Sequence, residues 1–343
     1  MGIETSCDET AAAIVEDGQH ILSNVVVSQV DIFAEYGGVI PEVAARSHLE
    51  AMLPVIDRAF SDAKCEWKDI DAIAVTHAPG LLGSLLVGTL TARTLAILHN
   101  KPLYAVHHLK SHVYANWLGL DGRAEPEFPI LALVVSGGHT QILYMREHNH
   151  FEIIGTTHDD AVGECFDKVA KVLGLPYPGG PSIAKAAHGL ADSHRYKLPH
   201  PKVEGLDFSF SGLKTAVLRA VQKELGLPIS HPSHDLKNHL NKQQVADFAA
   251  SFQQTAVEIL CEKIVSALET HPDVQSVLVA GGVSANEQLR KALPEAFFPE
   301  PSLSGDNGAM VAAACYYEIL SGAKPVDPFS LDIYPRVSIE SAD

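Results

Sequence analysis

Cysteine is scarce in this sequence, and its few cysteines show no pairing pattern. The 343 residues include five cysteines, and no Cys-x-x-Cys motif occurs among them. A disulfide framework and a zinc ribbon are therefore excluded. Isolated cysteines of this kind suit the reducing cytoplasm, which is where we expect the protein to work.

Long hydrophobic runs are missing as well. No stretch reaches about 18 uninterrupted apolar residues, so we expect no transmembrane helix and no membrane partner. The first residues, Met1 to Glu4, are acidic almost at once. They lack the order of basic and then apolar residues that is typical of a signal peptide, so we expect none.

Positive charge is also in short supply. Lys and Arg number 25 against 42 Asp and Glu, and the net charge of −17 argues against nucleic-acid binding through the overall field. Residues 168–223 depart from this balance, because nine basic and three acidic side chains give this window +6 and leave −23 for the remainder. A solvated surface is the ordinary explanation. A local surface for an anionic partner is the alternative.

What the sequence does have is a composition that can bury a large core. Hydrophobic residues make up 46% and charged residues 20%, which excludes a disordered or fibrous protein. The length exceeds the usual size of one core, so we expect two lobes. Short strand-like runs alternate with helical ones, which predicts an α/β fold. Residues 121–129 are the best candidate linker, and the strand–turn–strand pattern of residues 3–15 returns after it at residues 130–145.

Three turns rich in glycine or hydroxyl residues each follow an apolar strand-like run. They are Thr5–Thr10, Ser136–Thr140 and Ala280–Asn286. Glycine lets backbone N–H groups approach an anion and hydroxyls add donors, so such turns can hold phosphates. One of them alone is ordinarily a tight turn, but three at the carboxyl ends of strands predict a nucleotide cleft. None matches a Walker A or Gly-x-Gly-x-x-Gly motif, so neither a P-loop nor a Rossmann enzyme is indicated.

A histidine pair is the second signal. His108 and His112 share one face if the segment is helical and could hold a metal together. A structural histidine pair is the alternative. A zinc protease would need His-Glu-x-x-His, whereas Leu109, Lys110 and Ser111 stand between these histidines, so proteolysis is disfavoured. A metal would require a third ligand, which we expect to be a carboxylate from elsewhere in the chain.

Several acidic residues lie at positions where an ordinary role is available. Asp306 precedes an Ala-rich helical run, where an N-cap is the plain explanation. Asp8 and Glu9 are adjacent acids in a tight turn, where solvated side chains are usual. Asp167 lies in a helical run next to Lys168, and a surface ion pair is the alternative to a binding role.

Eight short motifs occur in a fixed order along the chain: Gly2–Thr10, Tyr36–Glu42, His107–His112, Val135–Gln141, Tyr177–Pro181, Leu206–Lys214, Ala280–Asn286 and Asp306–Met310. Together they resemble the TsaD family, the tRNA N6-adenosine threonylcarbamoyltransferases, in its bacterial form. The resemblance extends from Gly2 to about Pro335, which is nearly the whole chain.

The resemblance implies a fold and a reaction. The fold is that of the actin-like ATPases (ASKHA), with two α/β lobes around a central nucleotide cleft. Residues 1–127 would form the N-terminal lobe, to which residues 312–343 return, and residues 128–311 would form the C-terminal lobe. The reaction is transfer of threonylcarbamoyl from threonylcarbamoyl-AMP to the N6 amine of the adenosine 3′ to the anticodon, in tRNAs that read ANN codons.

The resemblance also assigns residues to roles. His108, His112 and Asp306 would bind one divalent metal ion per subunit, Fe(2+) in preference to Zn(2+). Asp8 and Glu9 would lie at the reaction centre. The residues that would bind the adenylate are Val134, Val135, Ser136, Gly137, Gly138, Asp167, Gly180 and Asn286. The implied partners are tRNA, a TsaB-like subunit and a TsaE-like ATPase.

The sequence departs from the family pattern at three points. Members commonly carry several more residues before Gly2, which leaves open where the natural chain starts. Ser304 and Gly305 replace a common Cys-Thr, and Ala184 replaces an acid found in some members, so we expect that contact to be absent. An ASKHA-type small-molecule kinase and a non-catalytic nucleotide-binding scaffold remain the alternative functions.

Overall fold

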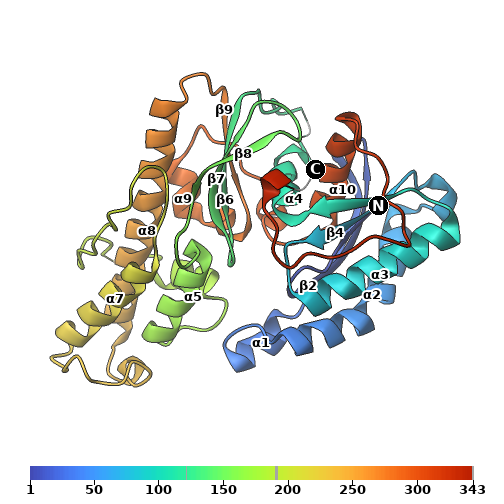
Figure 1. Cartoon of the computed structure of the whole chain (residues 1–343). Helices are drawn as coiled ribbons and strands as arrows, with labels where there is room; N and C mark the ends of the chain where they lie inside the picture. The colour runs from blue at the N-terminus through green and yellow to red at the C-terminus, as the bar shows by residue number, and fades with distance from the viewer. Residues whose placement is uncertain (121, 190–191, 342–343) are drawn as a thin grey trace.

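The computed structural model describes residues 1–120, 122–189 and 192–341, which form two β-sheets with helices on their faces (Figure 1). The first sheet has the strand order β3-β2-β1-β4-β5, and the second has the order β8-β7-β6-β9. The strands of the first sheet are β1 (Gly2–Glu4), β2 (Glu9–Glu16), β3 (His20–Ser28), β4 (Ile73–Ala78) and β5 (Leu103–His107). Those of the second sheet are β6 (Ile130–Val135), β7 (Thr140–Met145), β8 (Phe151–Thr156) and β9 (Ser276–Ala280). The predicted α/β class is confirmed.

The two sheets share one plan around their central strands. β1 pairs antiparallel with β2 and parallel with β4, while β6 pairs antiparallel with β7 and parallel with β9. Gly2 lies opposite Ala13 and Ala74, and Ile130 lies opposite Met145. The strand–turn–strand pattern that recurs in the sequence therefore corresponds to an equivalent hairpin in each sheet.

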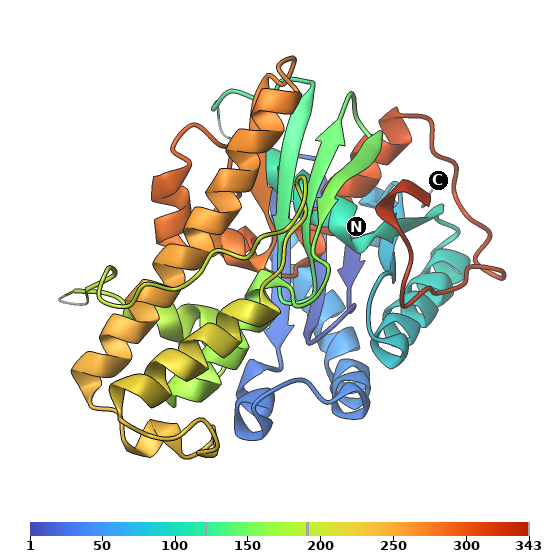
Figure 2. The ribbon, with the colours of Figure 1, turned by 60° about the vertical axis from the view of Figure 1, so that its left-hand side comes forward.

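The helices complete a stack of five layers. α2 and α3 cover the outer face of the first sheet, α4 and α10 lie between the sheets, and α5, α7 and α8 cover the outer face of the second sheet. Figure 2 brings α7 and α8 to the front of the second sheet. The helices are α1 (Val30–Tyr36), α2 (Pro41–Ala63), α3 (Leu82–His99), α4 (His108–Tyr114), α5 (Val162–Leu173), α6 (Gly179–Ala186), α7 (Ser211–Glu224), α8 (Lys242–Thr270), α9 (Glu287–Ala292) and α10 (Gly308–Leu320).

Strand β6 shows how alternating side chains join these layers. Ala132 and Val134 face the core that contains α4 and α10, whereas Leu133 and Val135 face the core under α5 and α8. Every residue of the strand is buried. An unbroken apolar run is what a strand between two covered faces requires.

The end of the chain returns to the first sheet. α10 packs against β1 and β2, and Val326 pairs with Leu103 beyond the end of the helix. Since α10 begins at Gly308, the expected division between residues 311 and 312 falls inside one helix. Asp121, which opens the candidate linker, lies outside the described residues, and residues 122–129 lead into β6 without a helix or strand.

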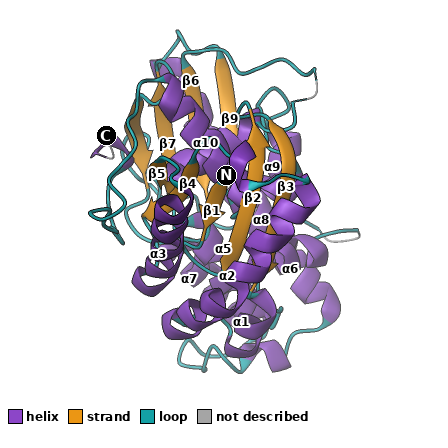
Figure 3. Cartoon of the chain, turned by 90° about the vertical axis from the view of Figure 1, so that its right-hand side faces the viewer, coloured by secondary structure: helices purple, strands orange, loops and turns teal. Residues whose placement is uncertain are grey.

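Helix α3 is long and apolar enough to cross a membrane by length and composition, with a mean hydropathy of 1.3 over 18 residues. One such helix is weak evidence for a membrane span, because core helices of other proteins pass the same test. Here α3 packs along α2 and β4, as the view from that side shows (Figure 3). The absence of a transmembrane helix stays a prediction.

Candidate active site

A cleft of about 1750 Å³ lies between the two sheets. Its walls include the segments that directly follow four strands: residues 6–9 after β1, 79–81 after β4, 136–139 after β6, and 282 and 283 after β9. Within each sheet the two parallel strands end on the same side, which is where α/β sheets bind ligands. The three turns that stand out in the sequence therefore meet in this space, which we call the central cleft.

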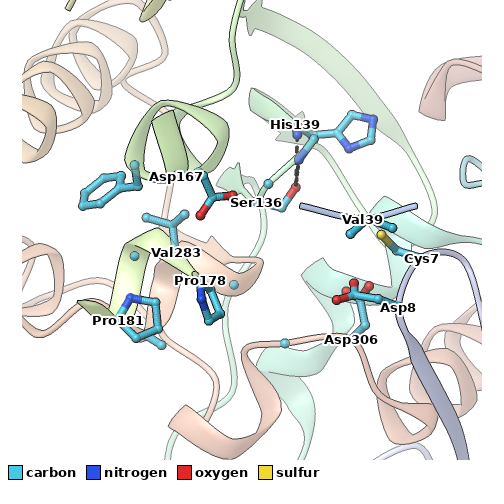
Figure 4. Close-up of a pocket in the computed structure, with 18 of the residues that line it drawn as sticks. Cys7, Asp8, Val39, Ser136, His139, Asp167, Pro178, Pro181, Val283 and Asp306 are labelled. Atoms are coloured by element: carbon cyan, nitrogen blue, oxygen red, sulfur yellow. Dashed lines mark hydrogen bonds between the residues drawn. The ribbon is translucent and has the colours of Figure 1, made fainter. Parts of the chain in front are cut away.

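The turn after β6 presents its backbone to the central cleft. The hydroxyl oxygen of Ser136 accepts hydrogen bonds from the N–H groups of Gly138 at 3.3 Å and His139 at 3.1 Å, which fixes the turn (Figure 4). Gly137 and Gly138 are exposed and face open space. The side chains of Val134 and Val135 are fully buried, so only the backbone of these two predicted adenylate residues remains for a contact. Of the residues in this strand and turn, Ser136 is the first that lines the cleft.

The turn after β9 approaches β6 closely. Gly281 has a φ of 88°, and a Cβ atom there would lie 2.5 Å from the carbonyl oxygen of Val135, so glycine is required. Asn286 lines the cleft, but its side chain is engaged: Oδ1 accepts from the N–H of Gln288 and caps α9, and Nδ2 donates to Gln253 at 2.9 Å. Both polar atoms of the Asn286 side chain therefore already have partners within the protein, and its contact with the adenylate stays a prediction.

Asp167 lies across the cleft from Asp8 and Asp306 (Figure 4). Its Oδ1 atom accepts a hydrogen bond from the N–H of Gly179 at 2.6 Å, and burial raises the pKa of its carboxyl above the usual range. Gly180 of α6 also lines the cleft, and no atom lies within 4 Å of the place where a Cβ would stand, so this side of the residue faces open space. The predicted residues of this wall are thus brought together with those of the first sheet.

Two histidines and one aspartate from distant parts of the chain meet at one edge of the cleft. His108 opens α4 and His112 follows one turn later, while Asp306 lies two residues before α10. The Nε2 atoms of His108 and His112 lie 3.6 Å and 3.1 Å from Oδ1 of Asp306. We call these three residues the central cluster. The N-cap of α10 is Asn307, whose side chain accepts a hydrogen bond from the N–H of Met310. Asp306 therefore does not cap this helix, which was the alternative to a metal-binding role.

The central cluster has the features of a metal site. A ligand atom from each of its three members lies within 4.8 Å of the others. His112 is buried, and neither of its ring nitrogens has a hydrogen-bond partner among the described residues. Its Nε2 atom faces Asp306 without hydrogen-bond geometry, which is costly unless a cation lies between them. The donor set therefore fits a divalent metal ion.

The charges at the cluster support the same conclusion. Burial opposes the charge on His108, but the carboxylates of Asp306 and Glu4 outweigh it and raise the pKa of this imidazole to about 9. Burial also opposes the charge on Asp306, yet His108 and His112 lower the pKa of its carboxyl to about 2. His139 behaves differently, since burial and the two cluster histidines lower its pKa to about 4. The site favours positive charge next to the carboxylates.

Glu4 is a member of this site that the sequence analysis missed. It lies at the end of β1 and is fully buried. Its Oε2 atom is 3.3 Å from Nδ1 of His108 and accepts a hydrogen bond from the hydroxyl of Thr76 at 2.5 Å, while its Oε1 atom accepts from the N–H of Ser6. A carboxylate behind a metal-binding histidine orients the ring. The available signal was an acid inside an otherwise apolar strand.

Asp8 and Glu9 line the cleft beside the central cluster, and Asp8 lies near Asp306 (Figure 4). The Oε1 atom of Glu9 accepts a hydrogen bond from the hydroxyl of Ser28 at 3.1 Å. Burial raises the pKa of Glu9 well above its usual range, and the negative charges of Asp306 and Asp8 raise it further. A carboxyl with a raised pKa can hold or release a proton near neutral pH.

The basic window is only partly available to a partner. Lys168 pairs with Asp160 at 2.7 Å, and Arg195 pairs with buried Asp247 at 3.2 Å. Lys185 lines the central cleft. The side chains that remain exposed in the same window include Lys197 and Lys202. Ala184, which stands where some members of the family have an acid, also lines the cleft. Its methyl group cannot make the contact that a carboxylate would make there.

The comparisons with known proteins agree with this arrangement. The chain is 49% identical to the tRNA N6-adenosine threonylcarbamoyltransferase of Symbiobacterium thermophilum, over 94% of this chain and 92% of that protein. It is 46% identical to the protein of the same name from Thermomicrobium roseum, over 99% and 96% of the two chains. Among solved structures, component A of the Acidaminococcus fermentans (R)-2-hydroxyglutaryl-CoA dehydratase superposes with a TM-score of 0.51 at 15% identity, over 93% of this chain and 98% of that one.

The expected actin-like ATPase (ASKHA) fold is confirmed by likenesses of this kind, which concern the fold alone. The family model described as "TsaD: tRNA N6-adenosine threonylcarbamoyltransferase" matches residues 20–313, which is most of the chain. The resemblance found in the sequence motifs is thus confirmed by two independent comparisons. The chain belongs to the TsaD family.

Proposed function

We propose that the central cleft is where this enzyme transfers a threonylcarbamoyl group from threonylcarbamoyl-AMP to the N6 amine of the adenosine 3′ to the anticodon, in tRNAs that read ANN codons. One observation carries the proposal: the central cluster and the turns after β6 and β9 open into the same space. Its volume of about 1750 Å³ exceeds that of an ordinary small-molecule pocket. That leaves room for an adenylate and for an incoming adenosine.

We propose further that His108, His112 and Asp306 hold one divalent ion. Two imidazoles and one carboxylate with free positions form a donor set that iron(II) enzymes use, so we favour Fe(2+) over Zn(2+). When bound, the ion would act as a Lewis acid toward oxygen atoms of the acyl donor. Glu4 would keep the ring of His108 in place through Nδ1.

The reaction requires no covalent enzyme intermediate, because AMP is already a good leaving group. The N6 amine attacks the carbonyl carbon of the threonylcarbamoyl group, and the bond from that carbon to the phosphate oxygen breaks, so that AMP leaves with the electron pair. The carboxylate of Asp8 or Glu9 accepts the proton that the amine loses. The N–H group of Gly137 would hold the phosphate, since that of Gly138 already donates to the hydroxyl of Ser136, and positioning and charge stabilisation would supply the catalysis.

The partners follow from charge and exposure. Lys197 and Lys202 would contact the backbone of tRNA, but the acidic remainder of the chain repels RNA, so a partner surface is needed. We propose a TsaB-like subunit, with a TsaE-like ATPase acting on the pair. Exposed leucines on neighbouring helices of the first lobe give such a protein partner an apolar face to contact; they are Leu49 and Leu53 of α2 and Leu86 and Leu90 of α3.

Two further expectations stay with this proposal. We propose that residues 1–127 together with residues 312–343 act as one lobe and residues 128–311 as the other, with the cleft between them. We also propose that the enzyme works in the cytoplasm. Its five free cysteines, of which Cys165 and Cys315 are buried, suit a reducing compartment.

The experiment is mass spectrometry of tRNA nucleosides after incubation with preformed threonylcarbamoyl-AMP, with and without a TsaB-like subunit. The unaltered enzyme should form threonylcarbamoyl-adenosine, and His112→Ala should form almost none, because the ion loses a ligand. His150→Ala is the matched control, since this histidine is on the surface with 74% of its side chain exposed. Full modification by His112→Ala would reject the metal-assisted reaction. Turnover of a small phosphoryl acceptor that is unaffected by His112→Ala would favour the kinase alternative.

A further inference from the structure

A second group of two histidines and one aspartate lies in the segment that joins α7 to α8, at the far end of the second lobe (Figure 1). Its members are His231, Asp235 and His239, and none of them lines the central cleft. The stretch is rich in histidine, because His234 lies between them as well. We call the three residues the α7–α8 cluster.

Both histidine rings of this cluster are hydrogen-bonded to the same carboxylate oxygen, a place that a cation could take from the shared protons. The Nε2 atoms of His231 and His239 lie 2.9 Å and 3.0 Å from the same carboxylate oxygen, Oδ2 of Asp235. The ligand atoms of all three residues lie within 4.8 Å of one another, and the two imidazole rings meet edge to face with centroids 5.5 Å apart. Two ring nitrogens and a carboxylate oxygen thus converge from three positions of a short segment.

We propose that His231, Asp235 and His239 bind a zinc ion at a site separate from the central cleft. Zinc accepts imidazole nitrogen and carboxylate oxygen at about 2.0–2.2 Å in tetrahedral geometry, which sets neighbouring ligand atoms about 3.3 Å apart. The observed 2.9 Å and 3.0 Å separations need only a slight opening to reach that value. Water would complete the coordination, because the site lies at the surface.

The surrounding residues hold the cluster in place. Leu236 is fully buried in the core of the second lobe and anchors the short helical turn that carries Asp235 and His239. The amide of Asn238 donates to Oδ1 of Asp235 at 2.9 Å, so that Oδ2 turns to the histidines. Gln222 of α7 donates to the backbone carbonyl of His231 at 3.1 Å. Fixed ligands with a supporting hydrogen bond are what a metal site needs.

The bound ion would tie the end of α7 to the start of α8. His231 is attached to α7 through Gln222, whereas His239 lies two residues before Asn241, which caps the start of α8. The cluster residues do not line the central cleft, and they connect two helices, so we assign the site a structural role. Zinc should therefore stabilise the second lobe and leave the transfer reaction unchanged.

The test is a count of zinc ions on the full chain, prepared without a polyhistidine tag and stripped of metal with a chelator. Equilibrium dialysis against micromolar zinc, followed by metal analysis, should give one ion fewer per chain for His231→Ala/His239→Ala than for the unaltered protein. His239→Ala alone changes an exposed ring and should give the same loss. His234→Ala is the matched control, because its ring lies in the same segment outside the cluster, and it should lose no ion.

The result is independent of the central cluster. His108→Ala/His112→Ala should remove a different ion, and the chain with all four substitutions should bind none. Zinc should raise the melting temperature of His108→Ala/His112→Ala and fail to raise it when His231 and His239 are also replaced. Equal zinc content in the unaltered protein and His231→Ala/His239→Ala would overturn the proposal. Binding that needs millimolar zinc, or that His234→Ala weakens equally, would overturn it too.

Discussion

The central cluster and the α7–α8 cluster contain the same three residue types but are built in opposite ways. The central cluster combines a histidine pair on α4 with an aspartate that precedes α10, and the side chains of His112 and Asp306 are 1% and 17% exposed. The α7–α8 cluster comes from one short segment, where Asp235 and His239 are 37% and 45% exposed. The donor atoms are similarly spaced in both.

The difference teaches that a donor set alone does not mark a catalytic centre. The central cluster adjoins a cleft lined by glycine-rich turns, Asp8 and Glu9, and it has a buried carboxylate behind one histidine. The α7–α8 cluster has an anchoring leucine and a capped helix beside it. One environment supplies substrate space and charge, and the other supplies only a link between two helices. Four experiments can break or sharpen this contrast.

Matched substitutions of the two aspartates should give the largest difference. Asp306→Ala removes the only carboxylate of the central cluster, so the rate of threonylcarbamoyl transfer should fall by at least about 100-fold. Asp235→Ala should leave the rate unchanged and lower only the zinc content. Nucleoside mass spectrometry after timed reactions measures the first effect, and metal analysis measures the second. Equal rates for the two variants would end the distinction between the clusters.

Glu4→Gln should produce the next largest effect. It tests whether a buried carboxylate behind a histidine ligand is a feature that the central cluster needs and the α7–α8 cluster lacks. The amide keeps the size of the side chain but loses the charge next to Nδ1 of His108, so metal affinity at the central cluster should fall by about 10–100-fold. The pKa of His108 in the metal-free protein should fall as well, which a merely structural role would not cause. Histidine NMR titration and metal competition measure both quantities.

The matched control for that change is Glu16→Gln, an exposed acid at the end of β2. It should alter neither the metal affinity nor the pKa of His108. An unchanged His108 pKa in Glu4→Gln would show that Glu4 acts only in folding. Zinc binding at the α7–α8 cluster should be the same in both variants.

The sequence predicted much of the central cluster. The spacing of His108 and His112 predicts one helical face, and α4 confirms that expectation. What the sequence left open was Asp306, because two adjacent residues can cap a helix and only the structure shows that Asn307 does so. The three turns were predicted to share a cleft because strand ends in parallel sheets gather on one side, and they do.

Other parts could not be predicted for physical reasons. Glu4 is three residues into a short strand, and its burial depends on Thr76 and His108, which only the fold brings near. The α7–α8 cluster was missed because the segment that carries it shows no regular helix in the sequence pattern and forms only a short helical turn in the structure. His231, Asp235 and His239 do follow one another at intervals of four residues, but Pro232 and the polar residues around them give the segment no helical pattern of apolar residues, so nothing in the sequence predicts that the three meet.

The pH dependence of stability should also distinguish the clusters in the metal-free protein. The pKa of His108 is raised to about 9, so its contribution is fully present below its unfolded value of about 6.5 and is lost as pH rises through 9. The free energy of unfolding should fall by about 3 kcal/mol across that interval. Urea denaturation at pH 6 and pH 9.5 measures it.

His108→Gln should remove most of that fall, and His234→Gln should keep it, because His234 is exposed and outside both clusters. An equally steep fall in His108→Gln would assign the effect to other groups. Saturating metal should also flatten the curve, because the ion replaces the proton on His108.

A change that touches neither cluster should give the smallest effect and act on RNA alone. Lys197→Glu/Lys202→Glu reverses two exposed charges of the basic window, so tRNA binding should weaken severalfold and the salt slope should fall by about two. Lys324→Glu, an exposed lysine after α10, is the control and should change neither. Binding measured across a salt series gives both values. Since neither substituted lysine lies at a metal ligand, metal content and the rate at saturating tRNA should stay constant. If the affinity of Lys197→Glu/Lys202→Glu for tRNA is unchanged, these two lysines are not part of the RNA surface, and tRNA binding falls to the partner subunit.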